Sequence, residues 1–507
     1  MQRLDRCLAN IEWLNSFPNT SVFHLPLLYS DPILAKIDTA RPCYRFCFKF
    51  ENWWLRERDF GLTVSQAWAS STLNPFALRL KQLSDHLCAW SKKKKPLQQQ
   101  LAKTEEDVLR IQESPNRHNL IDQEIKLSIV HDALLQKLSD YYKQRAKLHW
   151  SLQGDRNTAF FQHNQHETHT KPKSPSQQDI LNIIKNMKTD AAPGPDGFNS
   201  AFYVSCWDWI KHDVTTLIHD FYTSQVLPPG INSTNIVLIP KKHNPCKPED
   251  FRPISLCNVI YKIIAKSLAI QIREKIADCI DGSQQAFIKG RRASTNLIVV
   301  QEILHSFKLS SFHSSAFLLK LDLSKAFDRL EWKFIAHAML SKGFDPNFIN
   351  LVLQCISTPS FSVILNGKTT GHFTSQRGLR QGCPLSPYLF VLSVNVLAEK
   401  FQEQASLGHI KGIKLNGQGP TIHALFYADD IIITGQANAS EASAIRSLLN
   451  DFCKICGQTP NWLKSSVIFS SHTSQSERDD VCNFFPVQML NQSNLYLGNP
   501  IYSGTQS

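Results

Sequence analysis

The stretch Leu425-Phe-Tyr-Ala-Asp-Asp-Ile-Ile-Ile433 decides the fold of this chain. β-Branched and aromatic residues on both sides of two adjacent acids predict a strand, a tight turn at Asp429 and Asp430, and a second strand. Two like charges held beside apolar neighbours are costly unless a cation compensates them. The pair therefore lies at a water-exposed hairpin tip, or it binds a divalent metal such as magnesium, which prefers carboxylate and phosphate oxygens.

A third acid follows another apolar segment, Ala316-Phe-Leu-Leu-Lys-Leu-Asp-Leu-Ser324. Residues 317–323 predict a strand with Asp322 near its end, and Ser324 is predicted to cap a helix that runs to about Leu340 and closes at Gly343. Asp322 either reaches solvent or folds against the acid pair. In the second case three carboxylates would surround two cations about 4 Å apart, an arrangement that supports in-line phosphoryl displacement.

A glycine-containing loop, Arg377-Gly-Leu-Arg-Gln-Gly-Cys-Pro-Leu-Ser-Pro387, lies between the two acid motifs. Its glycines, Gly378 and Gly382, allow the backbone to approach a flat or charged ligand closely. Ser386 and Pro387 are predicted as the N-cap and first residue of a helix that runs to about Ala405. Three polar side chains beside this helix start suit a phosphate or a template strand: Arg377, Arg380 and Gln381.

Composition narrows the class of protein. The chain has 507 residues, 42% of them hydrophobic and 19% charged, which is typical of a globular protein of two to four domains. Its formal charge of +12 favours polyanionic partners. No apolar run is long enough to span a membrane, and the first residues lack the apolar core of a signal peptide. Thirteen scattered cysteines indicate reduced thiols in an intracellular protein, in the nucleus or the cytoplasm.

Changes of composition divide the chain. Residues 97–150 carry apolar positions spaced by three and four, which predicts long helices. Residues 170–178 read as a Pro- and Ser-rich linker, and Ala192-Pro-Gly-Pro-Asp-Gly197 predicts a rigid loop. Beyond it, helices and short strands alternate, as in a mixed α/β domain.

In this order the segments resemble reverse transcriptases of non-LTR (LINE-type) retrotransposons, particularly the plant ones. The resemblance covers about residues 180–507 and rests on ordered motifs: Ala192-Pro-Gly-Pro-Asp-Gly197, Ile239-Pro-Lys-Lys242, Arg252-Pro-Ile-Ser255, Leu321-Asp-Leu-Ser-Lys-Ala-Phe-Asp328, residues 377–387, Phe426-Tyr-Ala-Asp-Asp430 and Tyr496-Leu-Gly498. It implies an α+β fold, the palm and fingers of a right-hand polymerase, at residues 179–507 with a core at about 222–501. A mainly helical connector and linker at 41–178 and a C-terminal remnant of an endonuclease-like domain at 1–40 would precede it.

The resemblance also implies roles for individual residues. Asp322, Asp429 and Asp430 would be the catalytic acids and would hold two Mg²⁺ ions, with Mn²⁺ as an alternative. Phe327 stands where the family has an aromatic gate against a nucleotide 2′-hydroxyl. The remaining substrate-binding positions would line the template and nucleotide pocket (Gln381 and Gly382), contact the triphosphate (Lys242 and Arg252) and lie near the leaving pyrophosphate (Lys464).

The activity implied is RNA-directed DNA polymerisation, in which a nucleotide passes from a dNTP to a primer 3′-hydroxyl on an RNA template. The partners are RNA, DNA primer and dNTPs, with no membrane and no protein partner indicated. The departures from the family favour an alternative, a degenerate product that retains the fold and nucleic-acid binding without catalysis. Ser30-Asp31-Pro32 lacks the histidine of the family's endonuclease, and the chain stops where a thumb would follow, so we expect a chain truncated at both ends.

Overall fold

The computed structural model describes residues 48–71, 75–114, 120–145, 171–309, 312, 314–365, 367–415, 419–490 and 495–500. The chain divides into two compact units, Met1–Phe48 and Lys49–Ser507. Every element discussed below belongs to the second unit. The endonuclease remnant expected at residues 1–40 lies outside the described residues. Among the helices in these ranges, none is long and apolar enough to cross a membrane.

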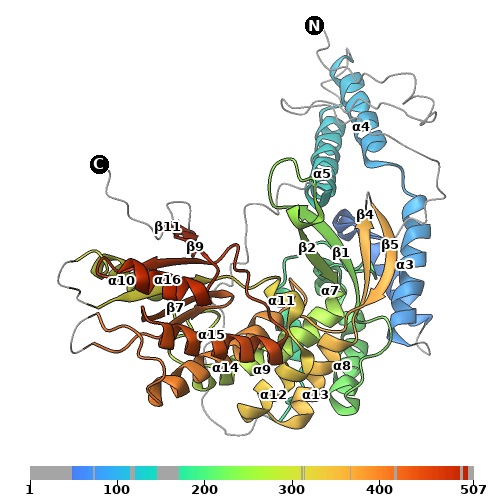
Figure 1. The fold of residues 1–507 in the computed structure, drawn as a ribbon. Coiled ribbons are helices and arrows are strands. Elements are labelled where there is room, and N and C mark those ends of the chain that lie inside the picture. The colour runs from blue at the N-terminus through green and yellow to red at the C-terminus, as the bar shows by residue number, and fades with distance from the viewer. Residues whose placement is uncertain are drawn as a thin grey trace, which may run out of the picture. The chain divides into compact units, whose positions relative to one another are not determined.

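Helices make up the first part of the second unit (Figure 1). They are η1 (Asn52–Arg56), α2 (Phe60–Ala69), α3 (Phe76–Lys92), α4 (Leu97–Gln112) and α5 (Ile121–Arg145). Helices α4 and α5 coincide with the long helices that the sequence predicts. This part is tied to α8 (Trp207–Ser224), because the Trp68 indole N–H and the Arg79 guanidinium both donate to the carboxylate of Asp213.

A four-stranded sheet follows, in the order β2-β1-β4-β5. Strand β1 (Ser233–Pro240) pairs antiparallel with β2 (Phe251–Cys257) and parallel with β4 (Ser360–Leu365), which pairs with β5 (Lys368–Thr374). The helices of this region are α6 (Gln177–Lys185), α7 (Ser200–Ser205), α8, α9 (Val259–Cys279) and α13 (Pro346–Ser357). Helix α9 buries residues on every side, as expected of a helix at the centre of a core.

The second sheet has five strands in the order β6-β7-β3-β8-β9. They are β3 (Ala316–Leu321), β6 (Ala424–Tyr427), β7 (Asp430–Gln436), β8 (Ser466–Phe469) and β9 (Gln488–Met489). Helix α10 (Ala293–Ser306) packs on one face, where Val300 and Ile303 join a core with Leu318 and Ile432. On the opposite face, Phe426 contacts Phe401 of α14 (Ser386–Ser406), and α15 (Ala439–Cys456) runs beside α14 (Figure 1).

The helix predicted from Ser324 to about Leu340 is wrong. The structure has two helices, α11 (Ala326–Arg329) and α12 (Trp332–Ser341), and the residue before α11 is Lys325, with a left-handed φ of 50°. The first helix stops because backbone carbonyls at its end accept hydrogen bonds from the glycine loop. The Phe327 carbonyl accepts from Leu379 N–H at 2.7 Å and the Leu330 carbonyl from Gly378 N–H at 2.8 Å, so neither bonds within a helix.

The loop Ala192-Pro-Gly-Pro-Asp-Gly197 packs against the start of α9. The Asn258 side chain accepts from Asp196 N–H at 3.1 Å and donates to the carbonyls of Gly230 and Ile231. A Cβ on Gly194 would lie 2.4 Å from both the backbone nitrogen and the side-chain oxygen of Asn258. The glycine is therefore needed for a close backbone contact between this loop and the start of α9.

We expect Gly194→Ala to lower the free energy of unfolding by about 2 kcal/mol or more, since the new methyl group meets backbone atoms that have no free space to move into. Gly282→Ala is the matched control, because its Cβ would meet nothing within 4 Å. Urea denaturation of both variants measures the difference. Equal stability of the two variants would contradict the close contact.

Candidate active site

Strand register brings two of the three acids together. In the antiparallel pair β3–β7 the last partners are Leu321 and Ile431, so Asp322 and Asp430 are the next residues opposite each other. Residues directly opposite in an antiparallel pair project from the same face of the sheet. Both side chains are half-buried, and both follow or begin a strand whose other residues are nearly all buried. Two residues 108 positions apart in the chain thus become neighbours.

The third acid lies in the turn that joins β6 to β7. Tyr427 pairs with Asp430, which leaves Ala428 and Asp429 as a two-residue turn. Ala428 has a φ of 53°, a left-handed conformation that two-residue hairpin turns require but alanine rarely adopts. The predicted strand, turn and strand are therefore present, with Asp430 already the first residue of the second strand.

A buried glutamine holds this turn from outside the hairpin. The side-chain oxygen of Gln284 accepts from Ala428 N–H at 3.2 Å and from Ala286 N–H at 2.9 Å. Next to it, Phe426 exchanges backbone hydrogen bonds of 3.0 Å with Ser283 and Gln285. Gln284 is completely buried. Its side-chain oxygen therefore supplies the acceptor that water would otherwise provide to these backbone N–H groups.

The charges of the three acids act on one another. Removal from water raises the pKa of Asp430, and the charges of Asp429 and Asp322 raise it further. Although Asp429 is exposed, the protein atoms around it raise its pKa, and so does the charge of Asp322. Lys320, half-buried in β3, lowers the pKa of Asp430 in part. The charge of Lys320 thus offsets the effects of Asp429 and Asp322 on Asp430 only in part.

This donor set suits a hard divalent cation, because carboxylate oxygens are its preferred ligands and its charge would cancel the repulsion. Within the residues that the structure describes, no three His, Cys, Asp or Glu side chains are already gathered closely enough to hold a metal. The three aspartates fit magnesium by their chemistry and their mutual repulsion. Their side chains would have to turn toward one another to share an ion.

A loop after α15 holds the backbone of Asp322 through two hydrogen bonds. The Asp322 backbone N–H donates to Ser465 Oγ at 3.0 Å, and its carbonyl accepts from Asn461 N–H at 2.8 Å. Lys464 lies in the turn between these two contacts and is exposed. The lysine expected near the pyrophosphate is therefore carried by the same turn that fixes the Asp322 backbone.

The predicted gate residue is attached to the glycine loop. The Phe327 ring stacks on Phe390 of α14 with centroids 4.6 Å apart, and its carbonyl binds Leu379 N–H. Gly378, with a φ of 89°, would bring a Cβ to 2.5 Å from the Asp328 carbonyl oxygen. The close approach that Gly378 permits is thus to the protein's own backbone, whereas the sequence predicted an approach to a ligand.

Arg380 does not face a ligand either. It is buried, with its guanidinium over the Tyr261 ring at 3.9 Å and hydrogen bonds to Thr234 Oγ1 at 2.8 Å and the Cys355 carbonyl at 2.9 Å. Its own carbonyl accepts from the Ser386 hydroxyl at 2.7 Å. Ser386 is the first residue of α14, and the N-cap is Leu385, one residue before the predicted cap.

The other predicted binding residues lie on this loop and on the β1–β2 hairpin. Gln381 is half-buried and its carbonyl accepts from Ser255 N–H at 3.4 Å, whereas Gly382 is exposed with a φ of 92°. Arg252 is exposed on β2. Lys242, beyond β1, pairs with Asp250 at 2.9 Å, and that pairing lowers the pKa of Asp250 to about 2. No hydrogen bond or ion pair described in the structure joins these residues to the three acids.

Several residues around the acids were not predicted from the sequence. Lys320 could have been found, because it lies two positions before Asp322 and alternation along a strand places both on one face. Asn296 had no local signal. Its amide donates to the Phe426 carbonyl at 2.9 Å and lies 3.4 Å from the hydroxyl of Tyr496. Tyr496, in the last predicted motif, therefore lies against the acid hairpin.

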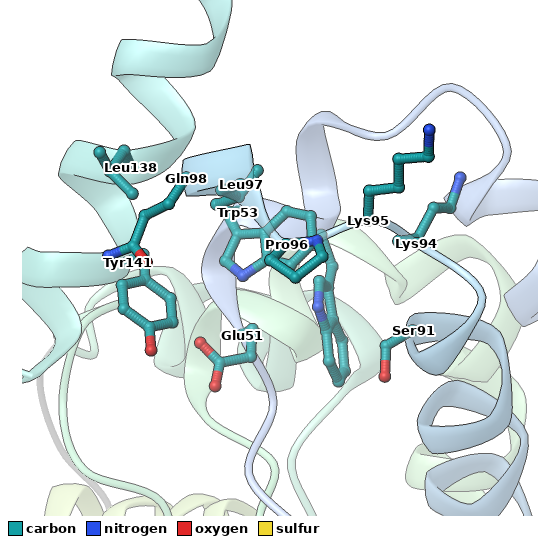
Figure 2. Close-up of a pocket in the computed structure, with 11 residues that line it drawn as sticks. Glu51, Trp53, Ser91, Lys94, Lys95, Pro96, Leu97, Gln98, Leu138 and Tyr141 are labelled. Carbon is teal, nitrogen blue, oxygen red and sulfur yellow. The ribbon is translucent and has the colours of Figure 1, made fainter. Parts of the chain in front are cut away.

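A pocket elsewhere in the chain contains none of these residues. It is lined by η1, the junction of α3 and α4, and α5 (Figure 2).

A family model of reverse transcriptases (RNA-dependent DNA polymerases) matches residues 239–498, which include the acids, the glycine loop, the end of β1 and all of β2. The chain belongs to the reverse transcriptase family. This confirms the mixed α/β polymerase fold that the motifs predict. The plant origin and the truncation stay predictions.

Relatives of the chain include proteins of transposable elements. It is 25% identical over 288 residues to the transposon TX1 uncharacterized 149 kDa protein of Xenopus laevis, covering 57% of this chain and 21% of that protein. It is 28% identical over 283 residues to the retrovirus-related Pol polyprotein from the type-2 retrotransposable element R2DM of Drosophila melanogaster, covering 56% of this chain and 25% of that protein. The chain thus spans at most a quarter of the length of these relatives.

A solved structure of apo telomerase from Candida tropicalis, truncated from its C-terminal domain, aligns with a TM-score of 0.36 and 15% identity. The alignment covers 55% of this chain and 57% of that one.

Replacing Gln284 by leucine should lower the free energy of unfolding by about 2 kcal/mol or more, because two buried backbone N–H groups lose their acceptor. Gln285→Leu is the control, since the side-chain amide of Gln285 donates to the Gly282 carbonyl at the surface. Thermal and urea unfolding of both variants test the difference. If the two variants are equally stable, Gln284 does not support the turn.

Proposed function

We propose that this chain is an RNA-directed DNA polymerase of a non-LTR retroelement, of the plant type that its motifs resemble. It would extend a primer 3′-hydroxyl with dNTPs on an RNA template. The observation that carries the proposal is the β3–β7 register, which sets Asp322 opposite Asp430 beside Asp429 in the turn. The formal charge of +12 is consistent with nucleic-acid partners.

Asp322, Asp429 and Asp430 would hold the magnesium ions. Bound there, magnesium would lower the pKa of the primer hydroxyl and neutralise charge on the leaving phosphates. The contacts of Gln284 and Ser465 would keep the backbone that carries the acids in place during turnover, so that only the side chains have to reorient around the metal.

The remaining residues would position the substrates. Phe327, held by its stacking on Phe390, would exclude a 2′-hydroxyl by its bulk. Gln381 and Gly382 would contact the template and the nucleotide, and Lys464 the pyrophosphate. Lys242 and Arg252 would bind the triphosphate, which for Lys242 requires exchange of its partner Asp250 for a phosphate.

Asp429→Asn should reduce primer extension on an RNA template with magnesium by at least about a hundredfold, because the variant loses one of the charges that bind the metal. Asp451→Asn, an exposed aspartate on α15, is the matched control and should extend primers like the wild type. Gel analysis of extended primers measures both. A wild-type chain that binds primer and template but yields no product with any metal would establish the degenerate alternative.

Phe327→Ala should increase ribonucleotide incorporation relative to deoxyribonucleotide incorporation by about tenfold or more, since the ring that would block the 2′-hydroxyl is removed. Phe327→Tyr retains a ring that can stack on Phe390 and should keep the discrimination. Single-nucleotide incorporation with paired rNTP and dNTP substrates gives the ratio. Unchanged discrimination in the alanine variant would remove Phe327 from the gate.

A further inference from the structure

The loop between α9 and α10, residues 280–292, covers an edge of the five-stranded sheet. Strand β6 is the outermost strand on that side. Gln284 forms a parallel β-bridge with Phe426 of β6, and the two neighbours of Gln284 exchange backbone hydrogen bonds of 3.0 Å with the same residue. The Gln284 side chain also accepts from Ala428 N–H in the turn between the strands. The position of the acid hairpin therefore depends on the shape of this loop.

One side chain links the two ends of the loop. The Arg291 guanidinium donates to three main-chain carbonyls, those of Gln284 at 2.6 Å, Ile280 at 2.9 Å, and Asp281. A guanidinium suits this task because it is planar and offers five N–H donors in a fixed fork. Arg291 is half-buried, and no ion pair among the described residues involves it. The described partners of its side chain are thus all main-chain oxygens.

The loop bends sharply before it reaches Arg291. Phe287 has a φ of 58° and Gly290 a φ of 86°, both in the left-handed region. That conformation is unfavourable for a bulky residue such as Phe287, and it persists only where surrounding contacts hold it. The bonds of Arg291 reach carbonyls that precede the whole bend, so they join its two sides. Without the guanidinium we expect the bend to relax.

The beginning of the loop is also fixed by the core. Asn395, fully buried in α14, accepts from Asp281 N–H at 2.8 Å. The Asp281 carboxylate in turn accepts from the backbone N–H and the hydroxyl of Ser283. These bonds end one residue before Gln284. Arg291 extends the anchoring to Gln284 itself, because it binds the Gln284 carbonyl.

This anchoring bears on metal binding. The three acids repel one another, and their side chains would have to converge to share an ion. A turn that is held in place limits this reorganisation to the side chains, whereas a loose turn lets the acids move apart. We propose that Arg291 is a positioning residue of the magnesium site, which acts through Gln284 on the turn at Ala428. The inference rests on the proposed function of the three acids.

Removal of Arg291 has two effects of opposite sign. By charge alone, loss of a cation near the acids strengthens the binding of another cation. Loss of the hydrogen bonds loosens the turn and weakens binding, and substitution of such supporting residues typically lowers metal affinity by about tenfold to a hundredfold. We therefore expect Arg291→Ala to weaken magnesium binding about tenfold. Arg292→Ala is the matched control, because Arg292 is exposed and no hydrogen bond or ion pair described in the structure involves its side chain. It should change the affinity by less than about twofold.

Iron-mediated cleavage measures the affinity without nucleotide incorporation. Fe²⁺ with ascorbate and peroxide is added to the full chain, and an ion bound at the acids cuts the backbone near residues 322 and 429. Mass spectrometry identifies the fragments. The Mg²⁺ concentration that halves this cleavage reports the affinity for magnesium. The same assay on Asp429→Asn gives the background from ions bound elsewhere.

Arg291→Lys supplies a second variant. It keeps the charge but replaces the planar fork by one ammonium group, so its affinity should lie between those of the wild type and Arg291→Ala. Thermal unfolding shows whether each variant is folded, and the lysine variant alone decides if the alanine variant is not. Wild-type affinity in the folded Arg291 variants, or tighter binding in Arg291→Ala, would overturn this inference alone. A wild-type chain that is not cut near the acids would overturn the proposed metal site and this inference with it.

Discussion

Six backbone pairs between β3 and β7, from Ala316–Gln436 to Leu321–Ile431, determine where the acids lie. The side chains of a strand alternate, so a slip of one residue would send either Asp322 or Asp430 to the opposite face. A slip in register is unfavourable, because the other residues of β3 and β7 belong to the hydrophobic core. Leu318 and Ile432 pack against α10, while Phe317 packs on the opposite side of the sheet. Moving the acids would therefore expose the core, and stability of the sheet maintains the geometry of the site.

The acids and their turn destabilise the end of the same two strands. Removal from water and their mutual repulsion raise the pKa values of Asp429 and Asp430, and Ala428 adopts a conformation that is unfavourable for a residue with a side chain. Neighbouring segments offset both costs through backbone contacts. Gln284 and Asn296 bind the hairpin, and the loop around Ser465 binds the Asp322 backbone. The side-chain carboxylates take no part in these bonds, so they stay available to a cation.

Local patterns in the sequence were sufficient for the elements that carry the acids. Alternating and β-branched residues predict both strands, and the resemblance of the ordered motifs joined Asp322 to Asp429 and Asp430. Long-range bonds explain what was missed. The break after Arg329 depends on Gly378 and Leu379, nearly fifty residues later. Arg380 has the composition of a surface cation, yet it is buried by Tyr261, Thr234 and the end of α13, none of which is near it in sequence.

The bonds between α11 and the glycine loop also constrain how this protein can vary. Phe327 and Leu330 give their carbonyls to the loop, and the Trp332 indole N–H returns a bond of 2.8 Å to the Gly378 carbonyl. Because main-chain atoms make most of these contacts, many side chains can change while the two segments remain joined. A single inserted or deleted residue in either segment would misalign all of them at once. Homologous chains are therefore expected to differ here by substitution while both segments keep their lengths.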